Sequence, residues 1–204
     1  MMPESEETAL ENRSSIRIIY AGSRLYGKVL DCGCNLGFLI DHLTDAVKEY
    51  EGIDMDGNLI TEAIDNYGPQ PGEPYPYSFE IGFRIHDVSR PLPYPDERFD
   101  SCFTGEVLEH LSDPLPTLRE IHRVLKRGGL LIVTTPLQWE GFNPDHKHEY
   151  GVQELKGLLS EAGLNVESVQ VVSQNPERWW RLLMVVEARK VRGVRSGGVV
   201  RTEA

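Results

Sequence analysis

Short apolar runs alternate along this chain with segments of helical periodicity, and no other sequence feature restricts the fold as strongly. The clearest run, residues 130–135, contains only leucine, isoleucine, valine and threonine and follows a glycine pair, as a buried strand would. The preceding segment, 114–126, carries its leucines and isoleucine at helical spacing. Strands that alternate with helices build a mainly parallel sheet with helices on both faces. The sequence therefore predicts an α/β fold.

The predicted elements occupy most of the chain. The last two strands have no helix between them, so we expect them to pair as an antiparallel hairpin at the edge of the sheet. Asp56 is expected to cap the helix that follows it, and the Pro- and Gly-rich segment 67–77 is expected to be a loop. The predicted helices are 5–25, 36–50, 57–66, 114–126 and 153–161, and the predicted strands are 28–32, 50–54, 79–88, 99–104, 130–135, 166–173 and 181–188.

The length of 204 residues suits one domain, which we place at 1–190. Residues 191–204 are basic, rich in glycine and without apolar periodicity, so they are predicted to be a disordered tail. The chain has no apolar run near the roughly 18 residues of a membrane span, and its acidic amino end resembles no targeting signal. We therefore expect a cytoplasmic protein without a membrane partner. A net charge of −11 also argues against nucleic-acid binding.

The three cysteines are Cys32, Cys34 and Cys102. A Cys-x-Cys pair without a second pair elsewhere is a poor metal-binding pattern. Free cysteine is commonly buried as a small apolar residue. We expect three buried, reduced thiols.

The turn after the first predicted strand reads Asp31-Cys-Gly33-Cys-Asn35-Leu-Gly37. Ligands of open α/β sheets bind where strands end, and glycine lets the backbone approach them closely. A dinucleotide site would require Gly-x-Gly-x-x-Gly, but the middle glycine is Asn35 here and the third is Phe38. A carboxylate at Asp31 suits an ammonium group better than a pyrophosphate. The loop therefore argues against NAD.

Two further acids follow the next two predicted strands. Asp54 ends the second strand, where it could accept hydrogen bonds from both ribose hydroxyls of a nucleoside. Asp87 ends the third strand, where it could meet an adenine amino group. Together with Asp31, these acids predict a pocket for an adenosine that bears a cation and no phosphate.

These motifs resemble the class I S-adenosylmethionine-dependent methyltransferases, in particular their small-molecule branch, over residues 27–188. VLDCGCNLG at 29–37 is similar to the family's first motif, with Asn35 where a glycine is usual, and YEGIDMD at 50–56 is similar to the second. Later segments continue the resemblance: HDVSRPLPYPDERFD at 86–100, EVLEHLSDP at 106–114 and LREIHRVLKRGGLLIVTTP at 118–136. The resemblance implies a Rossmann-like, doubly wound seven-stranded sheet of order 3-2-1-4-5-7-6 with strand 7 antiparallel.

The resemblance also implies the cofactor, S-adenosylmethionine, and the residues that bind it. Asp54 would hold the ribose, Met55 would pack on adenine, and Asp87 with the Val88 backbone would hold the adenine edge. The segment from Glu106 to His110 would line the methionine end. The expected cofactor-binding residues are Asp31, Gly33, Cys34, Asn35, Gly37, Phe38, Asp54, Met55, Asp87, Val88 and Glu106.

Two histidines are the candidate catalytic bases, His110 and His146. Methyl transfer can require removal of a proton from the acceptor, and histidine is a natural base near neutral pH. Segment 145–149 also contains acid and histidine spacings that metal sites use, but no separated ligand cluster accompanies them, so no metal is expected. His148-Glu149-Tyr150 could equally serve only to anchor a loop before a helix.

The acceptor is expected to be a small molecule, such as a sugar, a lipid-linked intermediate or another metabolite. No Asn/Asp-Pro-Pro-Tyr/Phe element follows the fourth strand, which argues against methylation of adenine, cytosine or glutamine nitrogens. Aromatic loop residues either enclose the acceptor or pack the loops: Tyr75, Tyr77, Trp139 and Phe142.

Three alternatives stay open from the sequence. Trp179 and Trp180 pack either at the sheet edge or on a dimer surface, so a homodimer is one of them. Another transferase with a related cofactor, such as an aminopropyl transferase, is the second. A non-catalytic partner subunit that kept the fold is the third, with Asn35 as its best support.

Overall fold

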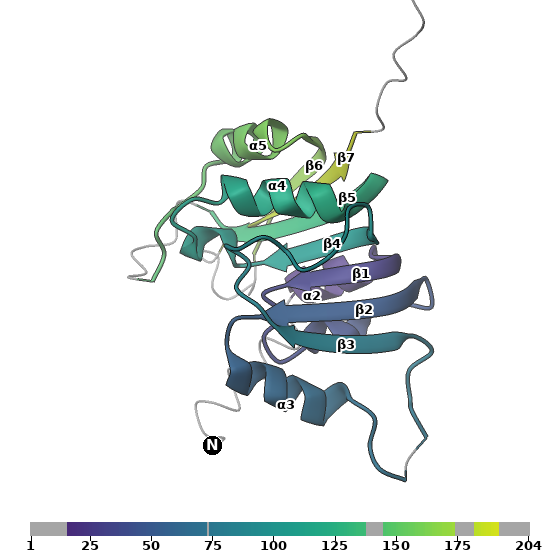
Figure 1. Cartoon of the computed structure of the whole chain (residues 1–204). Helices are drawn as coiled ribbons and strands as arrows, with labels where there is room; N and C mark the ends of the chain where they lie inside the picture. The colour runs from purple at the N-terminus through teal and green to yellow at the C-terminus, as the bar shows by residue number, and fades with distance from the viewer. Residues whose placement is uncertain (1–15, 73, 138–144, 174–181, 192–204) are drawn as a thin grey trace, which may run out of the picture.

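Seven strands form one sheet in the order β3-β2-β1-β4-β5-β7-β6 (Figure 1). The computed structural model describes residues 16–72, 74–137, 145–173 and 182–191. The strands are β1 (Gly27–Cys32), β2 (Val47–Asp54), β3 (Glu80–Ile85), β4 (Phe99–Gly105), β5 (Leu125–Pro136), β6 (Leu164–Ser173) and β7 (Leu182–Lys190). The helices are α2 (Ile16–Gly22), α3 (Gly57–Tyr67), α4 (Leu115–Val124) and α5 (Val152–Glu161), with the 3₁₀ helices η1 (Phe38–His42) and η2 (Leu108–His110).

The strand directions confirm the predicted fold class. β3, β2, β1, β4 and β5 pair in parallel, whereas β7 lies antiparallel between β5 and β6. β6 and β7 form the expected antiparallel hairpin, with β6 at the edge of the sheet. The observed order and the antiparallel seventh strand are those that the resemblance implied.

The side chains of β1 show how the two faces of the sheet are covered. Leu30 and Cys32 belong to the hydrophobic core that also contains residues of α4 and α5. Val29 belongs to a second core with residues of α2 and η1. Successive strand residues point to opposite faces, so Asp31 faces the α2 side with Val29. Figure 1 shows the same layers, with α4 and α5 on one face of the sheet and α2 on the other.

The expectation of a helix at 36–50 is wrong. The structure has only the five-residue η1 (Phe38–His42), after which Leu43 is already extended. β2 begins at Val47, which lies opposite Gly27 of β1. Val47 fits the alternation of a strand as well as it fits a helical period, and hydrogen bonding to a central strand outweighs that weak periodicity.

Other boundaries also differ from the prediction. The helix expected at 114–126 ends at Val124, and β5 begins at once rather than at residue 130. Gly128 lies inside β5 with a φ of 77°, in the stretch where the pairing with β4 shifts register. β3 ends at Ile85, so Asp87 lies in the turn beyond the strand and not at its end.

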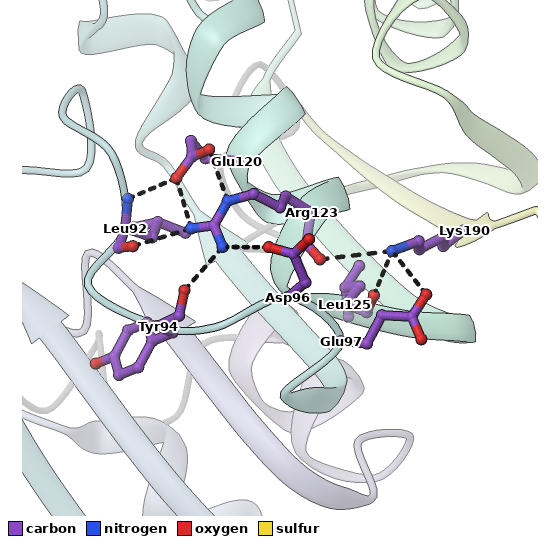
Figure 2. Close-up of polar contacts among 8 residues, drawn as sticks. All are labelled: Leu92, Tyr94, Asp96, Glu97, Glu120, Arg123, Leu125 and Lys190. Atoms are coloured by element: carbon purple, nitrogen blue, oxygen red, sulfur yellow. Dashed lines mark hydrogen bonds and ion pairs between the residues drawn. The ribbon is translucent and has the colours of Figure 1, made fainter.

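Arg123 of α4 fastens the chain segment between β3 and β4 onto the helix layer (Figure 2). Its guanidinium donates to the carbonyl oxygens of Leu92 and Tyr94, at 3.0 and 2.8 Å, and to the carboxylate of Asp96 at 2.9 Å. Glu120, one helical turn earlier, accepts from the same guanidinium. Nearer the cavity described below, the buried Thr117 hydroxyl donates to the carbonyl oxygen of Val88 at 3.0 Å. These contacts fix the loop that carries Asp87 and Val88.

Several smaller expectations also have an outcome. The three cysteines are buried and free, as expected, and Asp56 caps α3 by accepting from the amide of Asn58 at 2.8 Å. Within the described residues no helix is long and apolar enough to cross a membrane. The expectations for residues 1–15, for Trp139 and Phe142, for Trp179 and Trp180, and for the tail after Val191 fall outside the described residues.

Candidate active site

A cavity of about 410 Å³ opens at the carboxyl end of the sheet, where the strand order reverses between β1 and β4. Open α/β sheets bind their ligands at this kind of switch point. A volume of this size is typical of a small-molecule site. The cavity is lined by Arg17, Ile18, Asp31, Gly33, Cys34, Asn35, Phe38, Leu39, Asp54, Met55, His86, Asp87, Val88, Phe103, Gly105, Glu106, Val107, His110 and Leu111.

The loop after β1 uses left-handed backbone conformations at three positions. Gly33, Asn35 and Gly37 have φ values of 77°, 50° and 80°. A side chain at Gly33 would bring its Cβ within 2.4 Å of a methyl group of Val107, so glycine is required there. Asparagine tolerates this conformation better than most residues, and the Asn35 side chain accepts a 2.7 Å hydrogen bond from the amide of Leu36. Asn35 therefore preserves the turn that a glycine would make.

Asp54, at the end of β2, fastens this loop to the neighbouring strand. Its Oδ2 accepts from the amide of Asn35 and its Oδ1 from the amide of Asp56, both at 3.0 Å. Each carboxylate oxygen has a second lone pair. The carboxylate is thus held in a fixed orientation at the cavity wall and keeps acceptor capacity for a ligand.

Asp31 is a buried carboxyl group in the cavity wall, only 2% exposed. Burial raises its pKa to about 7, and the negative charge of Asp54 acts in the same direction. The hydroxyl of the buried Tyr50 donates to Asp31 at 2.7 Å and opposes this rise. A cation placed in the cavity would favour the ionised carboxylate.

Met55 after β2 and the turn after β3 also line the cavity. Met55 is 72% exposed, which leaves an apolar surface uncovered at the cavity. Asp87 accepts from the amide and hydroxyl of Ser89, at 2.9 and 2.7 Å, and these hydrogen bonds lower its pKa. Nε2 of His86 is buried and has no hydrogen-bond partner among the described residues.

Glu106 lies where β4 ends and has a φ of 55° although it is not glycine. Such conformations cost free energy and concentrate at functional sites. Its carboxylate pairs with the guanidinium of Arg17 at 2.7 Å, which connects this side of the cavity to α2. The conformation turns the chain from β4 into η2, which carries His110.

A group of three potential ligands lies beside the cavity: Glu109, His110 and His146. Their ligand atoms are all within 4.8 Å of one another. His110 and His146 also contact edge to face, with ring centroids 5.0 Å apart. Glu109 is 1% exposed, and burial raises its pKa to about 7. These residues come from η2 and from segment 145–150.

The structure brings most of the expected site residues to one cavity. Of the expected cofactor residues, Gly37 alone does not line it; this glycine packs beneath the loop against Tyr67 and Phe83. Of the two expected bases, His110 lines the cavity, whereas His146 lies against His110 and does not.

Sequence reasoning missed several lining residues. His86 directly precedes Asp87, and this adjacency to an expected site residue is a sequence signal that it lines the same cavity. Arg17 and Ile18 lie on a helix whose register the sequence left unclear. The others carry no sequence signal: Leu39, Phe103, Gly105 and Leu111. Val107 belongs to the segment 106–110 that is expected at the methionine end, and it lines the cavity.

Comparison with known proteins identifies the family. The sequence model of the family described as "Methyltransferase domain" matches residues 30–133, about half of the chain. The chain belongs to this methyltransferase family. The resemblance found in its sequence is thereby confirmed, and membership implies S-adenosylmethionine as the cofactor.

Individual methyltransferase relatives agree with the family. A Mycolicibacterium smegmatis protein named "Probable S-adenosylmethionine-dependent methyltransferase" is 30% identical over 146 residues, 68% of this chain and 52% of its own length. The ubiquinone biosynthesis O-methyltransferase of Ruegeria pomeroyi is 38% identical over 117 residues, 57% of this chain and 42% of its own length. The chain thus spans about half the length of these curated relatives.

A solved structure of the methyltransferase fold is similar over nearly the whole chain. It belongs to the complex between the Haloferax volcanii Trm112 methyltransferase activator and a methyltransferase. The TM-score is 0.74, with 93% of this chain and 95% of that chain covered. At 18% identity this likeness shows the fold alone.

Proposed function

We propose that this chain transfers the methyl group of S-adenosylmethionine to a small organic acceptor, at an oxygen atom. The observation that carries the proposal is that three carboxyl groups line one cavity: Asp31 near the end of β1, Asp54 at the end of β2 and Asp87 in the turn after β3. S-adenosylmethionine carries an ammonium group, two ribose hydroxyls and an adenine amino group. Each of these groups is a donor that suits a carboxylate.

The cofactor would extend across the cavity from β1 to β3. Its ammonium group would lie near Asp31 and its ribose hydroxyls against Asp54, whose orientation two amides hold. Adenine would cover the exposed Met55, which favours binding because it removes apolar surface from water. The unpartnered ring nitrogen of His86 and the carboxylate of Asp87 would meet its polar edge.

The methyl group would then point toward the segment from Glu106 to His110. Transfer from a sulfonium is an in-line displacement, so orientation and exclusion of water supply much of the rate. His110 lines the cavity and is the nearer candidate base, with His146 behind it. An oxygen acceptor is supported by the name of the Ruegeria pomeroyi relative, an O-methyltransferase.

Calorimetric titration with S-adenosylmethionine and S-adenosylhomocysteine tests the cofactor site. The wild-type chain should bind both, and Asp54→Ala should weaken binding by roughly 10- to 100-fold, because it removes charged hydrogen bonds worth about 1.5–3 kcal/mol each. Asp65→Ala is the matched control, since Asp65 is exposed on α3 outside the cavity. Unchanged affinity in Asp54→Ala would refute the assignment of the ribose, and no binding by the wild type would favour a partner subunit.

A labelled-methyl survey tests the reaction. The protein and S-adenosylmethionine carrying a radioactive methyl group are incubated with fractionated metabolite extracts, and labelled products are identified. We expect the label in a methyl ether of a small molecule. Label on nitrogen or carbon would contradict the oxygen acceptor. A parallel incubation with methyl-labelled decarboxylated S-adenosylmethionine that releases the label as methylthioadenosine would identify an aminopropyl transferase.

A further inference from the structure

We propose that Glu109, His110 and His146 form a binding site for one divalent transition-metal ion at the acceptor end of the cavity, with a coordination position open to the acceptor. The proposal deepens the proposed function and rests on it for the role of the ion. Two histidines with one carboxylate are the ligand set of several catalytic zinc sites, which keep a fourth position for water or substrate.

The three ligands are brought together by tertiary structure. Glu109 and His110 belong to η2, and His146 lies 36 residues beyond His110. The backbone of the later segment is held against η2, because the Lys147 amide donates to the Glu109 carbonyl oxygen at 2.7 Å. The resulting ligand atoms lie within 4.8 Å of one another. Ligand atoms around a tetrahedral zinc ion lie about 3.4 Å apart, so side-chain rotations that move these atoms by about 1 Å would complete the site.

The Glu109 carboxylate provides an independent indication of a ligand. The side chain is 1% exposed, and its Oε2 accepts from the Thr135 hydroxyl at 3.1 Å. Its Oε1 is buried without a hydrogen-bond partner among the described residues. A buried carboxylate oxygen without a partner is costly, and coordination to a cation would compensate it.

His110 is already oriented as a metal ligand would be. Its Nδ1 lies 3.1 Å from the carbonyl oxygen of Asp145, which can only accept, so Nδ1 carries the proton and donates. The Nε2 lone pair is then available for an ion. A metal-binding histidine usually donates its other ring N–H to a carboxylate, a backbone carbonyl oxygen or water, as Nδ1 of His110 does here.

With His110 bound to the ion, the ion and not a histidine base would activate the acceptor hydroxyl in the proposed reaction. His110 lines the cavity, so an ion beside it reaches an acceptor hydroxyl. Coordination lowers the pKa of that hydroxyl, and its proton passes to solvent water. The oxygen then bonds to the methyl carbon, and the carbon–sulfur bond breaks with its electron pair staying on sulfur, which leaves S-adenosylhomocysteine.

Equilibrium dialysis of the tag-free, chelator-stripped full chain against Zn²⁺ tests the site. We expect one equivalent to bind, and Glu109→Gln and His146→Ala to weaken binding at least about 100-fold, since even outer partners of ligands are worth roughly 10- to 100-fold. His148→Ala is the matched control, because His148 lies in the same segment but its Nε2 contacts the Ser112 carbonyl oxygen instead. Equal losses in His148→Ala and His146→Ala would overturn the assignment, as would no stoichiometric binding by the wild type.

Two further measurements keep the outcomes separate. Co²⁺ in place of Zn²⁺ should give visible bands of a nitrogen and oxygen site; a thiolate charge-transfer band would assign the ion to the cysteines and overturn the proposal. S-adenosylhomocysteine should bind the metal-free wild type and Glu109→Gln equally, because Glu109 does not line the cavity. If S-adenosylhomocysteine binds but Zn²⁺ does not, the metal site alone fails. If neither binds, the proposed function fails as well.

Discussion

The hydroxyl of Tyr50 donates a 2.7 Å hydrogen bond to Oδ2 of Asp31, and both side chains are buried where β1 and β2 pair. The bond supports a carboxylate that has been taken out of water and whose pKa burial raises to about 7. Folding therefore keeps this group near its point of ionisation at neutral pH. A positively charged ligand in the cavity would therefore shift Asp31 toward its ionised form.

Tyr50→Phe should lower the free energy of unfolding by about 1–3 kcal/mol at pH 8, because it leaves a buried carboxylate without its donor. Urea unfolding at pH 8 and pH 5 measures the effect. The loss should be smaller at pH 5, where Asp31 is protonated and needs less support. Tyr75→Phe serves as the control, since Tyr75 is exposed; equal stability of Tyr50→Phe and wild type at pH 8 would contradict the expectation.

Asp31→Asn should stabilise the fold at pH 8 by more than about 1 kcal/mol and weaken binding of S-adenosylmethionine. The pKa of Asp31 is higher in the folded than in the unfolded chain, so ionising it costs stability as the pH rises from about 4 to about 7. Asparagine removes that cost while still accepting from Tyr50. Chemical unfolding across this range should show the advantage shrinking toward pH 4; a pH-independent difference would argue against the raised pKa.

The affinity for S-adenosylhomocysteine should depend on pH through Asp31. Below its pKa of about 7 the carboxyl group is protonated and offers no charge to the ligand's ammonium. Affinity should fall about tenfold from pH 8 to pH 6 and change little above pH 8. Calorimetric titration at each pH measures this, and Asp31→Asn should flatten the curve. Glu109→Gln should leave it unchanged, because Glu109 lies outside the cavity lining.

Asn35→Gly should keep both stability and ligand affinity, whereas Asn35→Val should destabilise the chain by about 1–2 kcal/mol. The φ of 50° at this position is open to glycine and asparagine but strained for a β-branched residue. Thermal and urea unfolding of the two variants test the difference. Equal stability of both would show that the left-handed conformation is not retained in solution.

Arg123→Met should lower the free energy of unfolding by at least about 2 kcal/mol, because it leaves the carbonyl oxygens of Leu92 and Tyr94 without a charged donor (Figure 2). Arg127→Met is the control. Its side chain is 66% exposed and its guanidinium pairs with Glu97 at the surface, so its loss should cost less than about 0.5 kcal/mol. Urea unfolding that gives both variants the same stability would refute the anchoring role of Arg123.

Much of the fold follows from patterns within single segments. The apolar run at 130–135 predicts a central strand, and glycines beside strand ends predict a loop that approaches a ligand. The carboxylates at 31, 54 and 87 could be placed together because parallel strands end at one edge of a sheet. The single-domain assignment of 1–190 stays a prediction.

Other features depend on contacts between distant segments, which no local pattern encodes. The stretch 36–50 fits a helical period, yet pairing with β1 makes its last residues a strand. The sequence predicts His110 and His146 as separate bases, and folding places their rings 5.0 Å apart beside the buried Glu109. That histidines would lie near the reacting groups could be anticipated from the sequence. The arrangement of Glu109, His110 and His146 could not be anticipated, because it depends on the packing of segment 145–150 against η2.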